Sequence, residues 1–140
     1  MADRFAAFPG VREFPEGVRT AADAARAVGC EVGAICKSLV FVREADGAPL
    51  LVIASGANRV DEAALRVRKA DAAFVREVTG AAIGGVPPFG HPAPLETLVD
   101  EDLLAYAEVW AAAGTPTHVF PIAPAQLVER TGGRVTRVAG

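Results

Sequence analysis

The sequence predicts a single α/β (α+β) domain that spans residues 1–140. Three observations predict it. The chain is long enough for one core, 51% of its residues are apolar, and capped helical segments are interspersed with short apolar runs rich in β-branched residues. We therefore expect one hydrophobic core and no second domain.

The first expected helix covers residues 21–28. Thr20 stands at the N-cap position, and Gly29 follows the last helical residue. Aspartates at 61 and 71 predict the starts of two more helices, and a proline in the first turn predicts a fourth. These three helices are expected over residues 62–65, 72–78 and 124–131.

The central expected strand lies at residues 39–42, where a continuous apolar run is typical of a strand buried on both faces. Asp46 and Gly47 give a hairpin signal, so this strand should pair antiparallel with residues 49–54. Further strands are expected at residues 95–99, 117–122 and 135–138. Residues 106–113 combine helix-forming alanines with strand-forming aromatic and β-branched residues, so periodicity leaves this segment open.

Lys37 lies at the start of the central apolar run. The chain has only two lysines, and its other basic residues, histidines aside, are arginines. A buried ammonium loses hydration unless partners compensate it or its head group reaches an open edge. A snorkelling lysine is one interpretation. The other is a functional lysine at a cleft edge that holds a phosphate, polarises a carbonyl or acts as a nucleophile.

The densest glycine and proline segment covers residues 81–92 and contains Gly84, Gly85, Pro87 and Pro88. Adjacent glycines allow close backbone approach to a ligand, and the prolines that follow hold the exit rigid. A tight connection between strands and a binding loop both fit this pattern. The segment lacks the lysine and hydroxyl residue of a phosphate-binding P-loop and does not match the dinucleotide fingerprint.

Several kinds of chemistry find no support in the sequence. The two histidines and two cysteines have no metal-ligand spacing, so we expect no metal and no cofactor. Cys36 is interpreted as a core residue, although a thiol nucleophile with His91 or His118 as base remains an alternative. His118 is interpreted first as a structural histidine. The acidic residues 100–102 are interpreted as a solvated turn.

A net charge of -3 excludes the broad basic surface of a protein that coats nucleic acid, and we expect no DNA binding. The one basic cluster, Arg66, Arg68 and Lys69, fits a solvated helix face or a phosphate contact. No apolar run is long enough to span a membrane and the amino terminus has no leader pattern. A cytoplasmic location without membrane association is therefore expected.

The lysine strand, the glycine and proline loop and their order in the chain together resemble the YbaK/ProX family. The residues that carry the resemblance are Cys36-Lys37-Ser38-Leu39-Val40-Phe41, then Thr79-Gly80, then Gly84-Gly85-Val86-Pro87-Pro88-Phe89-Gly90-His91. Gly84 to Pro88 meet the family motif of glycine, three residues and proline, and the essential lysine of the family falls on Lys37. The resemblance covers nearly the whole chain. This family comprises editing domains that act on aminoacyl-tRNA and is related to the insertion domain of bacterial prolyl-tRNA synthetase.

The resemblance implies a mixed, curved sheet of about seven strands surrounded by helices, with residues 106–113 as a strand. It also implies a freestanding deacylase that hydrolyses the ester of a mischarged small amino acid on tRNA, using Lys37 for catalysis. The implied partners are the acceptor end of aminoacyl-tRNA and a synthetase. Candidate substrate-binding residues are Ser38, Gly84, Gly85, Val86, Pro87, Pro88 and His118. The alternative function is a non-catalytic small-ligand or synthetase-binding module on the same fold.

Overall fold

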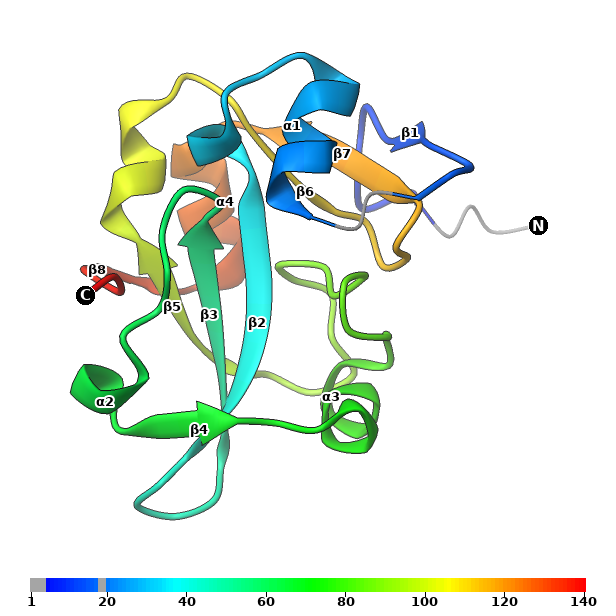
Figure 1. Cartoon of the computed structure of the whole chain (residues 1–140). Helices are drawn as coiled ribbons and strands as arrows, with labels where there is room; N and C mark the ends of the chain where they lie inside the picture. Colours follow the sequence, from blue (N-terminus) through cyan, green and yellow to red (C-terminus); the bar gives the residue numbers. More distant parts are fainter. Residues whose placement is uncertain (1–4, 18–19) are drawn as a thin grey trace.

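The computed structural model describes residues 5–17 and 20–140. Its strands are β1 (Arg12–Glu13), β2 (Cys36–Arg43), β3 (Pro49–Ser55), β4 (Val67–Lys69), β5 (Glu96–Asp100), β6 (Val109–Ala112), β7 (His118–Ile122) and β8 (Arg134–Thr136). Its helices are α1 (Ala21–Val28), α2 (Glu62–Leu65), α3 (Ala72–Thr79) and α4 (Pro124–Thr131), with 3₁₀ turns η1 (Val32–Ala34) and η2 (Glu101–Ala105). The mixed α+β class predicted from the sequence is confirmed (Figure 1).

The strands divide into two sheets, which differs from the single curved sheet expected. One sheet has the order β4-β2-β3-β5-β8 and the other β1-β7-β6. A single parallel bridge between Ile35 and Trp110 links them beside the start of β2. The two sheets stay separate because β6 meets this side of β2 at that one bridge and pairs along its length with β7 instead.

The hairpin of β2 and β3 is the centre of the larger sheet, as predicted. The two strands pair antiparallel from Cys36↔Ser55 to Val42↔Pro49, and Gly47 closes the turn with a positive φ of 73°. On the far side of β3, β5 and then β8 add in parallel. Parallel neighbours end at the same edge of a sheet, so the carboxyl ends of β3 and β5 meet.

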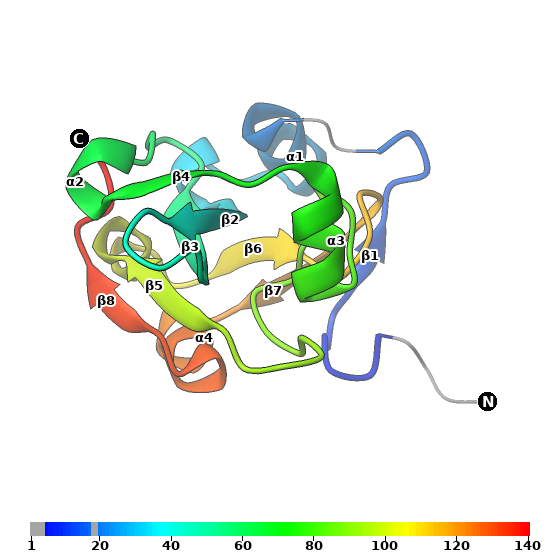
Figure 2. The ribbon, with the colours of Figure 1, turned by 90° about the horizontal axis from the view of Figure 1, so that it is seen from below.

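The predicted helix caps are confirmed. The side chains of Thr20, Asp61 and Asp71 each accept a hydrogen bond from a backbone N–H in the first turn of α1, α2 and α3. Each bond satisfies a donor that the helix itself leaves free and stabilises the helix by about 1 kcal/mol. Figure 2 shows α2 and α3 at the two ends of β4.

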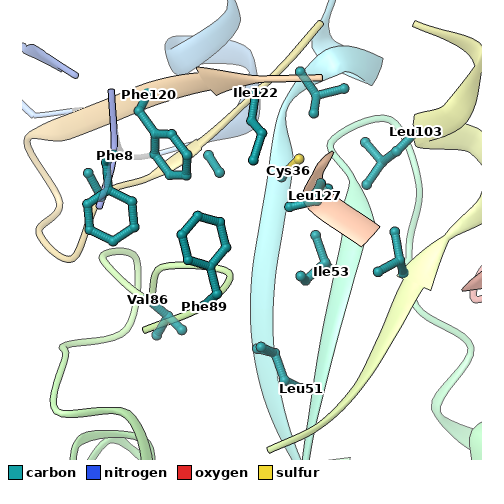
Figure 3. Close-up of a cluster of buried hydrophobic side chains, with 14 of the residues drawn as sticks. Phe8, Cys36, Leu51, Ile53, Val86, Phe89, Leu103, Phe120, Ile122 and Leu127 are labelled. Atoms are coloured by element: carbon teal, nitrogen blue, oxygen red, sulfur yellow. The ribbon is translucent and has the colours of Figure 1, made fainter. Parts of the chain in front are cut away.

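The main core lies between the two sheets and is closed by α4 (Figure 3). Phe8, Phe89 and Phe120 form an aromatic cluster with ring centroids 4.7 to 5.8 Å apart. Leu51 of β3 and Leu127 of α4 are completely buried in the same core. Burying each large apolar side chain contributes about 1.5–3 kcal/mol, so this core holds β2 and the rest of its sheet in place against the other sheet.

Two local expectations need correction, and one strand was not expected. Arg66 has a positive φ, and Arg68 and Lys69 belong to strand β4, so the basic cluster is not a helix face. Only Val109–Ala112 of the expected 106–113 strand is extended in β6, because Tyr106 still belongs to the end of η2. Residues 9–17 contain β1, which pairs with β7 and which the glycines and prolines of this segment hid.

Candidate functional site at the open edge of β2

The edge of β2 that faces away from β3 is only partly covered. β4 pairs with β2 from Phe41 to Arg43, and the bridge at Ile35 reaches β6. Between these contacts, no strand in the described part of the chain pairs with β2 on this edge. The gap opens into a cleft of about 770 Å³, a volume typical of small-molecule sites.

The cleft brings several elements together. Its wall is β2, and β6, the first turn of α1, the tip of the glycine and proline loop and the segment after β3 complete it. Of the residues predicted from the sequence, Lys37, Ser38, Gly84 and Val86 line the cleft. Gly85, Pro87, Pro88 and His118 are not part of its lining.

Lys37 is half-buried in the cleft wall. Its Nζ donates a hydrogen bond to the backbone carbonyl oxygen of Asn58, 2.6 Å away. Burial lowers the pKa of Lys37, the nearby Asp100 carboxylate raises it, and Arg59 lowers it. Lys37 has no carboxylate oxygen within 4.0 Å among the described residues, so its charge is not neutralised by a direct ion pair.

Asp100 holds the segment to which Lys37 is bound. It is 1% exposed, and its Oδ2 accepts hydrogen bonds from the Ser55 backbone N–H and the Asn58 side-chain amide, both at 2.9 Å. Its Oδ1 accepts from the Asp102 backbone N–H at 3.0 Å. The interpretation of residues 100–102 as a solvated turn was therefore wrong for Asp100, since a carboxylate at the end of β5 meets the end of β3.

The tip of the glycine and proline loop forms another part of the cleft. Gly84 has a φ of 91°, and a Cβ there would meet no atom within 4 Å. Gly85 points the other way, because its Cβ would lie 2.8 Å from the carbonyl carbon of Thr115. Gly84 thus gives the loop its turn beside the cleft, and Gly85 allows the loop to pack on the backbone of residues 115–116.

The prolines of the loop are not part of the cleft lining. Pro87 and Pro88 are buried. The His91 Nε2 lies 2.8 Å from the Pro87 carbonyl oxygen, and burial lowers the pKa of His91. A neutral His91 with its proton on Nε2 donates to this oxygen and holds the loop in shape.

The remaining candidates are His118 and Cys36, and of these only Cys36 belongs to the lining of the cleft. Nδ1 of His118 is 2.7 Å from the Thr115 hydroxyl and its ring stacks on Phe5 at 4.3 Å, so its predicted substrate contact gains no support from this geometry. Cys36 is buried in the main core, and burial raises the pKa of its thiol (Figure 3). A protonated buried thiol is a poor nucleophile.

Two basic residues belong to the lining of the cleft, and two more lie near them in the chain. Arg59 and Lys69 belong to its lining, and Arg66 and Arg68 are exposed beside them. Within residues 5–17 and 20–140, none of these four has a carboxylate oxygen within 4.0 Å. Cations without such partners at the mouth of a cleft attract anionic ligands.

Sequence reasoning missed Asn58, Arg59, Asp100 and Trp110 as parts of the site. A usable signal was Asp100, the first acidic residue after an apolar strand, because a carboxylate carried toward the core needs partners. The described residues hold no cluster of three or more histidine, cysteine or acidic side chains that could bind a metal ion. None of their helices is long and apolar enough to cross a membrane.

Comparisons with known proteins agree on one family. A family model described as an aminoacyl-tRNA editing domain matches residues 15–129. An uncharacterized protein of Bacillus subtilis strain 168, YwhH, is 31% identical over 131 residues, which cover 89% of this chain and 83% of that protein.

Two solved structures share the fold. One comes from work on epitope backbone grafting onto scaffold proteins, with a TM-score of 0.85, 44% identity and coverage of 93% of this chain and 86% of that one. The other is described as "a putative trans-editing enzyme for prolyl tRNA synthetase", with a TM-score of 0.84, 49% identity and coverage of 93% and 85%. The resemblance to the YbaK/ProX editing domains is confirmed, and the chain belongs to the aminoacyl-tRNA editing domain family.

Proposed function

We propose that this chain is a trans-editing aminoacyl-tRNA deacylase, a freestanding enzyme that hydrolyses the ester between a mischarged small amino acid and tRNA. The substrate tRNA is tRNA(Pro) or a related species, by analogy with the structure described for prolyl-tRNA synthetase. The observation that carries the proposal is the Lys37 ammonium, which lies in a cleft wall with no carboxylate oxygen of the described residues within 4.0 Å.

The chemistry requires stabilisation of developing charge more than a nucleophile. Water adds to the ester carbonyl carbon, the bond from that carbon to the ribose oxygen breaks, and the proton lost by the water ends on the ribose hydroxyl. The tetrahedral state carries negative charge on the former carbonyl oxygen, and a fixed cation or N–H group stabilises it. Lys37 supplies positive charge to this oxygen or to the terminal phosphate of the tRNA.

Among the described residues, the thiol and imidazole side chains supply no activated nucleophile for a covalent route. Cys36 contributes a thiol whose pKa is raised by burial, and neither His91 nor His118 is part of the lining. In this proposal the attacking water is oriented by substrate hydroxyls and backbone groups. The reaction then needs only positioning and electrostatic stabilisation, which a small cleft can provide.

A deacylation panel tests the function. Purified protein is mixed with tRNA(Pro) and with control tRNAs that carry alanine, serine, threonine, cysteine or proline, and loss of the ester is measured against the uncatalysed rate. We expect acceleration for at least one small non-cognate amino acid on tRNA(Pro) and little for prolyl-tRNA(Pro). Acceleration of none would favour a non-catalytic module that binds a small ligand or a synthetase on the same fold.

A further inference from the structure

The backbone of Ser38 lies in the uncovered gap of β2, and the pairing register fixes the direction of its polar groups. The Arg43 N–H donates to the Ala48 carbonyl oxygen across the hairpin, so odd-numbered residues of β2 direct their backbone groups at β3. Because this direction alternates along a strand, Ser38 directs its N–H and C=O away from β3. They face the part of the edge that β4 and β6 leave open.

This uncovered edge is unlike an ordinary strand edge. Exposed edges are usually short, charged or covered, because unpaired N–H and C=O groups attract other chains. Here the gap lies between two covered segments and forms a wall of the cleft. The Ser38 hydroxyl is also buried without a hydrogen-bond partner among the described residues. A polar group left this way needs an explanation, and a ligand bound in the cleft would provide one.

An α-aminoacyl ester has the right pair of groups for such an edge. In an antiparallel ladder, two facing residues exchange both hydrogen bonds, since the N–H and C=O of one meet the C=O and N–H of the other. An aminoacyl group carries an α-ammonium donor and a carbonyl acceptor on one residue. It therefore has the polar pattern of a strand one residue long.

We propose that the aminoacyl group of the substrate pairs with Ser38 as a single added β-residue. The ester carbonyl oxygen accepts a hydrogen bond from the Ser38 backbone N–H, and the Ser38 carbonyl oxygen accepts one from the α-ammonium group of the substrate. The Ser38 N–H then stabilises the oxyanion of the tetrahedral state. This inference rests on the deacylase function proposed above.

This pairing has two consequences for the site. The contacts involve groups that every amino acid shares, so selection among side chains falls to other parts of the cleft. The oxyanion donor comes from a strand held by seven register pairs with β3 instead of from a loop. A donor on a rigid element keeps its position during the reaction, which oxyanion stabilisation requires.

Two variants of Ser38 separate the contribution of the backbone N–H to the rate from that of the side chain. Ser38→Pro removes the N–H at an edge position where proline is tolerated, because that N–H pairs with no strand. Ser38→Ala keeps the N–H and removes only the hydroxyl. We expect Ser38→Pro to lower the single-turnover rate by about 10²–10³-fold and Ser38→Ala, which loses only the contact of the hydroxyl, to lower it by about tenfold or less. Circular dichroism and the melting temperature establish that both variants are folded.

A second test needs no variant and covers the case in which Ser38→Pro fails to fold. The unmodified protein is given alanyl-tRNA and propionyl-tRNA, which differ only by the α-ammonium group. Each rate is divided by its uncatalysed hydrolysis rate, because the ammonium also activates the ester. We expect the acceleration to fall at least tenfold for propionyl-tRNA.

The outcomes separate the two proposals. An unmodified protein that accelerates hydrolysis of no aminoacyl-tRNA overturns the deacylase function itself. An active protein whose folded Ser38→Pro variant matches Ser38→Ala overturns the pairing at Ser38 and leaves the deacylase function standing. Equal acceleration of alanyl- and propionyl-tRNA likewise overturns the contact with the α-ammonium group.

Discussion

Lys37 and Asn58 are joined by a hydrogen bond of 2.6 Å from the lysine Nζ to the backbone carbonyl oxygen of Asn58. The side-chain amide of the same Asn58 donates to the buried Asp100. The ammonium is thus oriented by a neutral acceptor, while the Asp100 carboxylate, which raises the pKa of Lys37, is hydrogen-bonded to the same Asn58. A cation held in this way keeps most of its charge available for an anionic transition state.

The first prediction concerns Lys37→Ala. We expect the single-turnover deacylation rate to fall by at least 10²-fold, because one electrostatic contact to developing charge is lost. The melting temperature should change little, since the side chain is half-buried and makes one hydrogen bond. Lys37→Arg should rescue poorly, because a planar guanidinium cannot replace a compact ammonium at the same place. A rate within threefold of the unmodified protein would remove Lys37 from the catalytic site.

The second prediction concerns Asp100→Asn and the dependence of the rate on pH. Burial lowers the pKa of Lys37, and the Asp100 carboxylate opposes this effect. Without that negative charge the pKa of Lys37 falls further, so the ammonium is lost at a lower pH. As the pH is raised, we expect the rate of the variant to begin to fall at a lower pH than the rate of the unmodified protein. Uncatalysed ester hydrolysis is subtracted from both rates.

The control for Asp100→Asn is Asp102→Asn. Asp102 also accepts a hydrogen bond from the Asn58 amide, at 2.7 Å, but it is exposed to solvent. Its charge is therefore screened, and its replacement should leave the pH profile unchanged. A shared shift in both variants, or a loss of rate in Asp100→Asn that is the same at every pH, would indicate a structural role for Asp100.

The third prediction concerns the two cysteines. Cys36→Ala combined with Cys30→Ser should keep the deacylation rate within threefold, because burial raises the pKa of both thiols and keeps them protonated. The free energy of unfolding should fall by roughly 1–2 kcal/mol, since Cys36 is part of the main core. A folded variant without activity, or a trapped thioester, would instead support a thiol nucleophile.

Local sequence signals predicted the elements of this chain well. Thr20, Asp61 and Asp71 cap the helices that they were expected to cap, and Gly47 closes the hairpin. These features depend on residues a few positions apart in the sequence, so the pattern alone is informative. Lys37 was identified for a similar reason, because a lysine stands out at the start of an apolar strand.

Features that depend on distant segments were not predicted from the sequence. The open edge at Ser38 exists because β4 and β6 both stop short along β2, and no local pattern encodes where two separate strands stop. The burial of Asp100 depends on the end of β3, which lies 45 residues earlier. The opposite directions of Gly84 and Gly85 depend on how the loop packs on residues 115–116.

The fourth prediction separates these two glycines. Gly85→Ala should lower the free energy of unfolding by about 1–3 kcal/mol, because its Cβ would lie 2.8 Å from the backbone of Thr115. Gly84→Ala meets open space and should cost only about 1 kcal/mol of backbone strain from its positive φ. The sequence indicated that the adjacent glycines allow close backbone approach to a ligand, but at Gly85 the close approach is to the backbone of residues 115–116. Chemical denaturation of both variants gives the comparison, and equal losses would contradict it.

The fifth prediction concerns the basic side of the cleft. Lys69 pairs with Phe41 across β4 and β2, and Phe41 shares a face of β2 with Lys37 four residues away. The two lysines are therefore separated by about 13 Å along one face, given a rise of about 3.3 Å per residue. Arg59 lines the same cleft. We expect these groups to bind phosphates of the tRNA acceptor end.

Lys69→Glu and Arg59→Glu should each lower kcat/KM for full-length aminoacyl-tRNA about tenfold. Each should also reduce the steepness of the salt dependence by about one unit on a logarithmic plot, as expected for one lost phosphate contact. An aminoacylated CCA trinucleotide has few phosphates for these residues to contact. Both variants should therefore hydrolyse it at nearly the rate of the unmodified protein. The matched control is Arg134→Glu, which makes the same charge change on β8 at the other edge of the sheet. If all three variants lose the same activity, long-range charge and not a phosphate contact on the β4 side would explain the effect.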